Sequence, residues 1–218
     1  MKRQITTDYG GSAGSTAIII IMASILIGAI VASVVSSGTT GSTTEEDLAE
    51  QAEQVLYETL DEITTYIQIK ESYGKYYGGN GQQKIEKIAI EIKSLISKNI
   101  DISDLTIKLL DGETIKTLFY NNTVEPIESN SVFGHPIWNN MDENNFGLIV
   151  IHDNDNSLVN YSAITENSDR AYLIIRLPDD MAMSKGETLL VKLVPAVGIT
   201  RSIELKAPLP IKPVIVFE

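Results

Sequence analysis

One long, uncharged and mostly apolar run near the N-terminus constrains this chain more than any other feature. It spans residues 17–35, AIIIIMASILIGAIVASVV, and no second run of this length occurs in the 218 residues. As a helix rising roughly 1.5 Å per residue, it would be about 28 Å long, close to the hydrocarbon thickness of a bilayer. The run is therefore a cleaved secretory signal, a permanent membrane anchor, or the polymerising helix of a pilin-type subunit.

Small residues recur at every fourth position along this run, at Ser24, Gly28, Ala32 and Ser36. Residues four apart share one face of a helix, so they form a ridge on which another helix backbone can approach closely. Small residues are also common in membrane helices that do not associate. The β-branched residues around the ridge favour a helix that packs on copies of itself.

The leader before the apolar run indicates how the chain is processed. Lys2 and Arg3 would hold it on the cytoplasmic side by the positive-inside rule. In a secretory signal the small-residue cleavage site follows the apolar region. Here a small-residue segment, 10–14, precedes it, although residues 34–40 could still serve as a downstream site.

The segment 11–35, GSAGSTAIIIIMASILIGAIVASVV, resembles the N-terminus of archaellins, the filament subunits of the archaeal flagellum. That family has a short basic leader ending in glycine, then a small residue, then a helix rich in Ile, Leu, Val and Ala. The resemblance implies cleavage after Gly10 by a prepilin-like peptidase, with cleavage after Gly11 as the alternative. Ser15 stands where many bacterial type IV pilins carry glutamate, which also fits an archaellin.

Composition excludes several other classes of function. The formal net charge of −12 argues against nucleic acid or an anionic membrane surface as a partner. No cysteine is present, so disulfides and thiolate metal sites are excluded and stability must come from packing and assembly. His135 and His152 have no partners at metal or triad spacing, and no catalytic motif is present. We therefore predict that the protein is not an enzyme.

A second amphipathic pattern follows the apolar run. The segment between them, 36–44, SSGTTGSTT, is small and polar, and its two glycines leave open either a continuous helix or a kink. From 45 to 63, apolar residues at helical spacing predict a helix. We therefore divide the N-terminal part into a leader, residues 1–10, and a filament-core helix, residues 11–63.

The hydrophobic period changes from helical to two at residue 64, which predicts a β-rich head over residues 64–218. Segments 66–77 and 87–95 form a hairpin around a glycine-rich turn, with a helix over 84–97 as the competing interpretation. Further strands are predicted at 105–109, 114–120, 147–152, 171–177, 187–193, 202–205 and 214–217. Many short strands without intervening helices predict an Ig-like β-sandwich. The expected fold class is therefore α+β, a long N-terminal helix followed by this sandwich.

Later segments extend the resemblance to archaellins. Residues 100–113 are similar to the family segment that follows the first hairpin, and residues 168–178 and 186–210 are similar to its closing strands. The similarity is weak from 121 to 166, where the chain is polar and rich in asparagine.

Two features of the head are candidate sites. Asp153 and Asp155, in DNDNS, offer oxygens at alternating positions, as a calcium loop does at its start. The glycine and distal glutamate of an EF-hand are missing, so an Asx-rich turn is the simpler explanation. Sequons at Asn121 and Asn160 fall in predicted exposed loops, where N-glycosylation is sterically allowed. The resemblance implies glycans there and a metal ion in the head of some members; no other cofactor is predicted.

The resemblance implies a structural subunit that polymerises with itself into the extracellular filament of the archaeal flagellum. Before assembly, the apolar helix would hold the subunit in the cytoplasmic membrane, where the peptidase, the archaellum assembly motor and the membrane platform would act on it. The alternatives are an adhesion pilin, a minor archaellum subunit, and a single-pass membrane-anchored exoplasmic binding domain. The mature N-terminus distinguishes a pilin, starting at Gly11, from an anchored protein starting at Met1 or a secreted one starting near Ser37.

Overall fold

The computed structural model describes Gln54 and residues 66–78, 83–95, 99–127, 131–209 and 212–217. The chain divides into two compact units, Met1–Asp61 and Glu62–Glu218. The leader, the apolar run and the kink region lie outside the described residues, and in the predicted helix 45–63 only Gln54, which is helical, is described. Within the described ranges, no helix is long and apolar enough to cross a membrane.

The second unit is a β head. Its strands are β1 (Ile67–Tyr77), β2 (Lys84–Ser94), β3 (Ile100–Asp101), β4 (Thr106–Leu110), β5 (Ile115–Pro126), β6 (Asn145–His152), β7 (Ala163–Ile164), β8 (Arg170–Arg176), β9 (Thr188–Val194), β10 (Arg201–Lys206) and β11 (Val214–Phe217). Short helices also occur, the 3₁₀ turns η2 (Val132–Gly134) and η3 (Pro136–Asn140), and α3 (Ser157–Tyr161).

The strands predicted from the sequence are confirmed to within a few residues, and the hairpin is formed by β1 and β2. The competing helix over 84–97 is wrong. Ile88, Ile90 and Ile92 all point inward from β2 and are fully buried, which the period of two in this segment requires. The expectation of no intervening helices is also wrong, because α3 and the two 3₁₀ turns interrupt the run of strands.

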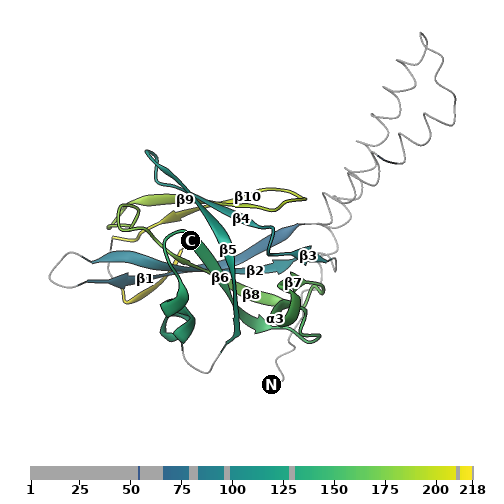
Figure 1. Cartoon of the computed structure of the whole chain (residues 1–218). Helices are drawn as coiled ribbons and strands as arrows, with labels where there is room; N and C mark the ends of the chain where they lie inside the picture. The colour runs from purple at the N-terminus through teal and green to yellow at the C-terminus, as the bar shows by residue number, and fades with distance from the viewer. Residues whose placement is uncertain are drawn as a thin grey trace, which may run out of the picture. The chain divides into compact units, whose positions relative to one another are not determined.

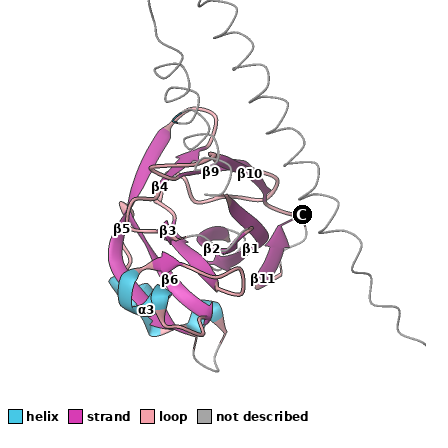
Figure 2. Ribbon diagram, turned by 90° about the vertical axis from the view of Figure 1, so that its right-hand side faces the viewer, coloured by secondary structure: helices cyan, strands magenta, loops and turns pink. Residues whose placement is uncertain are grey.

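Nine strands form one sheet in the order β10-β9-β4-β5-β6-β8-β2-β1-β11. Only β5 and β6 are parallel in this sheet, and β3 pairs with β7 in a small separate sheet beside α3 (Figure 1). The large sheet curls so that β10, at one edge, contacts β1, which lies next to the other edge (Figure 2).

The β head is therefore as predicted, but its facing layers belong to one curled sheet rather than to the two separate antiparallel sheets of an Ig-like sandwich. Register shifts provide the bends, at Ile69/Ser72 and Lys75/Tyr76 in β1 and at Tyr120/Val124 in β5. Extra residues of this kind increase local twist and allow a long sheet to wrap around its own core.

The core fills the interior of the curled sheet with aliphatic side chains from alternating positions. Phe146 is its largest fully buried side chain, and Ile and Leu side chains from β2, β4, β6, β8 and β9 surround it. Burial of this apolar surface, worth about 25 cal/mol per Å², is the main stabilising contribution in a head without disulfides.

A second apolar cluster lies outside the sheet, over β2, β6 and β8. Phe133, Ile137, Trp138 and Met141 pack on the outward side chains Ala89, Ile149 and Ile174. The rings of Phe133 and Trp138 stack with their centroids 5.9 Å apart, and Trp138 Nε1 donates to the Val132 carbonyl at 2.8 Å. This half of the outer surface is thus covered by the chain's own segment, residues 132–141.

His135 belongs to the same covering segment. It is buried, and its Nδ1 accepts from the Ile137 N–H at 3.2 Å while its Nε2 lies 3.2 Å from the Pro126 carbonyl. The first contact caps η3 and the second joins the ring to the end of β5, so the histidine has a structural role. His152 is exposed at the end of β6.

Candidate functional site

Three carboxylates from two parts of the sequence meet at one edge of the head. Asp153 and Asp155 follow the end of β6, and Asp169 directly precedes β8. β6 and β8 are antiparallel neighbours with His152 opposite Arg170, so the end of one strand and the start of the other adjoin. One carboxylate oxygen from each of the three aspartates lies within 4.8 Å of the others.

Asp169 is the fully buried member of this cluster, which we call the aspartate cluster. Its Oδ2 accepts from the Thr165 and Glu166 N–H groups, at 3.0 and 2.9 Å, and from the Ser157 hydroxyl at 3.5 Å. Its Oδ1 is buried and has no hydrogen-bond partner in the part of the chain that the structure describes. A buried acceptor without a donor costs about 1–3 kcal/mol.

The other two carboxylates are oriented by the turn between β6 and α3. Asp153 Oδ1 and Asp155 Oδ1 each accept from the Ser157 N–H at 3.0 Å, and Asp153 Oδ2 accepts from the Val159 N–H at 3.1 Å. Asn156 supports the turn with a left-handed backbone, φ 59°. The Asx-rich turn expected from the sequence is therefore present, and it also directs two carboxylates toward the third.

The electrostatic surroundings of these two aspartates differ. Burial raises the pKa of the Asp153 carboxyl, and the neighbouring carboxyls of Asp155 and Asp169 add to the rise. Hydrogen bonds from the Thr165 hydroxyl, at 2.7 Å, and from Ser157 lower the pKa of Asp155 to about 2. At neutral pH Asp155 is therefore ionised, while burial and the neighbouring carboxyls oppose ionisation of Asp153. The Arg170–Glu91 ion pair of the described ranges does not involve the aspartate cluster.

The chemistry of the cluster suits a hard divalent cation. Carboxylate oxygens are the ligands that Ca²⁺ and Mg²⁺ prefer, and the unpartnered Asp169 oxygen is available to coordinate one. The sequence pattern indicated Asp153 and Asp155 but missed Asp169. Its proximity depends on the pairing of β6 with β8, although an aspartate just before a predicted strand was a usable signal.

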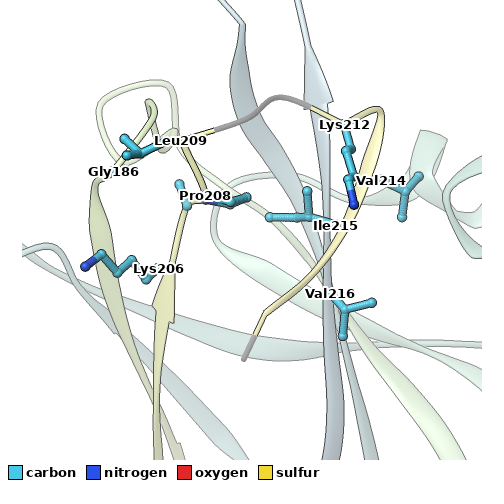
Figure 3. A pocket seen from close by; sticks show the side chains of 9 residues that line it. Gly186, Lys206, Pro208, Leu209, Lys212, Val214, Ile215 and Val216 are labelled. Carbon is cyan, nitrogen blue, oxygen red and sulfur yellow. The ribbon is translucent and has the colours of Figure 1, made fainter.

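A hollow with a volume of about 780 Å³ lies between the two edges of the curled sheet, and Figure 3 shows the side chains that line it. It is lined by Gly186, Lys206, Ala207, Pro208, Leu209, Lys212, Val214, Ile215 and Val216. The ionisable side chains of this lining are Lys206 and Lys212, and no carboxylate, histidine or hydroxyl side chain is among the lining residues.

Comparison with known protein families gives the broader context. The family model described as archaeal-type flagellin matches residues 11–205, which is most of the chain. The chain belongs to the archaeal-type flagellin family. The archaellin resemblance seen in the sequence is thereby confirmed.

Curated relatives agree with this assignment. Flagellin B3 of Methanocaldococcus jannaschii is 26% identical over 205 residues, covering 91% of this chain and 90% of the relative. Flagellin B4 of Pyrococcus abyssi is 27% identical over 214 residues, covering 91% of this chain and 93% of the relative. Flagellin A1 of Haloferax volcanii is 25% identical over 176 residues, covering 80% and 76%.

Two solved structures share the fold. The crystal structure of flagellin FlaB1 from Methanocaldococcus jannaschii matches with a TM-score of 0.59 and 21% identity, covering 69% of this chain and 95% of that chain. The archaeal flagellum of Methanospirillum hungatei matches with a TM-score of 0.52 and 12% identity, covering 94% and 99%. Together with the family match, these two structures show that the head has the flagellin fold. The chain is a structural subunit of the archaeal flagellum filament at the cell surface.

The two sequons of this flagellin lie in different settings. Asn160 is exposed in the last turn of α3. Asn121 does not lie in an exposed loop, as the sequence suggested, but within β5, and its Nδ2 donates to the Asn140 carbonyl at 3.4 Å and to Asn145 Oδ1 at 3.5 Å. The polar residues Asn121 and Asn122 suggested a loop from the sequence, but β5 continues through them with a register shift. N-glycosylation at both sites stays a prediction, with Asn160 the more accessible.

The remaining predicted residues of the flagellin precede the head. The leader cleavage sites, Gly10 and Gly11, and the ridge residues, Ser24, Gly28, Ala32 and Ser36, lie outside the described residues. Their roles therefore stay predictions.

Proposed function

We propose that this flagellin polymerises through the apolar run, residues 17–35, after a peptidase removes its leader behind Gly10. The observation that carries the proposal is the position of that run. It is the longest apolar segment of the chain, it follows a short basic leader, and the family match begins at residue 11, directly after the expected cut. The head has its own core, with fully buried side chains from the large sheet, so we expect it to fold without the run.

In this proposal the run has two successive surroundings. In the precursor, it spans the cytoplasmic membrane with the basic leader inside. After cleavage, the helices leave the lipid and bundle together, exchanging lipid contacts for helix–helix contacts along the ridge of small residues. Energy for the transfer would come from an assembly motor at the membrane, because the chain has no phosphate-binding glycine motif of its own.

Substitution at the cleavage site tests the proposal. Gly10→Leu places a bulky side chain where the peptidase must bind, so we expect a longer, membrane-retained precursor and no filaments. Thr6→Leu adds similar bulk within the leader but away from the cut, and should process and assemble normally. Precursor length on gels and filaments by electron microscopy provide the two readouts. Normal filaments from cells that express only Gly10→Leu would contradict the proposed cleavage site.

We further propose that the aspartate cluster binds a divalent cation, Ca²⁺ or Mg²⁺, which stabilises the head. Three carboxylates within 4.8 Å repel one another, and the buried Asp169 oxygen lacks a donor among the described residues. A cation held by Asp153, Asp155 and Asp169 would offset both costs, because oxygen ligands of this kind suit hard cations. It would also join the end of β6 to the start of β8.

A further inference from the structure

The described residues cover only one half of the outer surface of the curled sheet. Residues 132–141 pack over β2, β6 and β8, as described above. Over β4, β5 and β9, large apolar side chains point outward instead. Ile115 and Phe119 of β5 are 68% and 61% exposed.

The strand registers place the outward side chains of this half in three rows. Each row runs across β5, β4 and β9. The first row is Ile115, Leu110 and Leu190, and the second is Thr117, Lys108 and Lys192. The third row is Phe119, Thr106 and Val194. We call this nine-residue surface the open face. Two apolar rows thus flank a central polar row that carries two lysines.

The open face has the composition of a contact surface. Monomeric proteins expose single apolar residues freely, but aligned apolar residues on one sheet face usually mark a place where something packs. Here two strongly exposed side chains, Ile115 and Phe119, continue into the half-buried Leu110, Leu190 and Val194. On the other half of the sheet, residues 132–141 cover the outward apolar side chains.

The charges of the open face indicate the partner. Lys108 and Lys192 are directly opposite each other, and like charges in this position are destabilising unless an anion approaches. Neither has an ion-pair partner in the described ranges. The chain itself is acidic, with 29 Asp and Glu against 17 Lys and Arg. Its stretch 45–62, EEDLAEQAEQVLYETLDE, contains eight acidic residues and no basic one.

We infer that the open face is the surface on which a second copy of this chain docks in the filament, with carboxylates of its stretch 45–62 facing Lys108 and Lys192. The inference rests on the proposed self-assembly. That stretch also carries apolar residues at helical spacing, so it offers both the apolar and the acidic groups that the open face complements. A homopolymer brings every open face near copies of that stretch.

A single introduced thiol tests the docking, because the chain contains no cysteine. Thr117→Cys places the thiol in the central row, and Tyr161→Cys places one at a site 75% exposed, on α3 and within the second sequon. Maleimide labelling is followed in intact filaments and in subunits dissociated from them. We expect Thr117→Cys to react about tenfold more slowly in filaments than in subunits, as protection by burial requires. Tyr161→Cys should react similarly in both.

Each other outcome overturns the inference in a recognisable way. Equal, fast labelling of Thr117→Cys in both states would show that the face stays uncovered. Equal, slow labelling would show that the subunit covers the face with its own chain. If the unsubstituted chain forms no filaments, self-assembly itself fails, and the inference with it.

Charge reversal provides an independent readout. The double variant Lys108→Glu, Lys192→Glu should give fewer and shorter filaments at unchanged precursor levels, because the docking carboxylates would then face carboxylates. Lys185→Glu reverses an exposed charge in the turn before β9 and should assemble normally. Normal filaments from the double variant would contradict the docking of an acidic stretch on this face.

Discussion

Asp169 is a fully buried carboxylate whose Oδ1 has no donor in the described ranges. If a cation occupies the aspartate cluster, added Ca²⁺ or Mg²⁺ should raise the melting temperature of the full-length subunit. At one hundred times Kd the expected rise is about 5–10 °C. Asp169→Asn should abolish this rise, whereas the exposed Asp104→Asn should keep it. A full rise in the Asp169→Asn subunit, measured by calorimetry against chelator, would contradict the site.

Thr165 gives a second test at the same scale, through pH. Its hydroxyl donates to Asp155 and is the largest cause of the lowered pKa, about 2 in the folded head against about 3.9 when unfolded. A carboxyl whose pKa is lowered by folding stabilises the folded state at pH values above its unfolded pKa. This stabilisation is lost as pH falls from about 4 to 2. Thr165→Val should therefore destabilise the subunit more at pH 6 than at pH 2. A difference in unfolding free energy that does not change with pH would count against this role.

At the scale of elements, the edge strand β11 depends on a glycine in its neighbour. β11 pairs with β1 from Ser72↔Phe217 to Lys75↔Val214. A Cβ at Gly74 would lie 2.8 Å from the Phe217 ring, so Gly74→Ala must displace that ring and should cost about 1–3 kcal/mol. Gly134→Ala is the matched control, because its nearest contact would be an ordinary 3.7 Å. Equal unfolding midpoints in urea for the two variants would disprove this packing role.

The elements also show which parts of the fold local sequence can predict. Strands such as β4 and β9 were predictable because burial of one side chain in two leaves a period of two in the sequence. The two-residue strands β3 and β7 are too short to leave such a pattern. The parallel pairing of β5 with β6, the continuous curled sheet and the position of Asp169 all depend on contacts between distant segments. The hydrophobic period within one segment carries no information about contacts between distant segments.

At the scale of the whole molecule, the chain separates two tasks. The head folds around its own core and presents the aspartate cluster and the open face. The apolar run, outside the head, contributes the longest apolar surface of the sequence. At about 25 cal/mol per Å² of apolar surface, helices packed along such a run would bury more than the exposed side chains of the open face can. The run should therefore hold the polymer together, while the heads set how neighbours fit.

Gly28→Leu tests most directly whether the apolar run holds the polymer together. The substitution makes the segment more hydrophobic, so a membrane anchor should tolerate it, but it blocks close helix approach on the ridge. We predict that cells expressing only Gly28→Leu contain normal amounts of cleaved, membrane-held subunit and no filaments by electron microscopy. Ile30→Leu, on the opposite side of the helix, should assemble normally. Filaments of normal number and length from Gly28→Leu would contradict the central role of the helix.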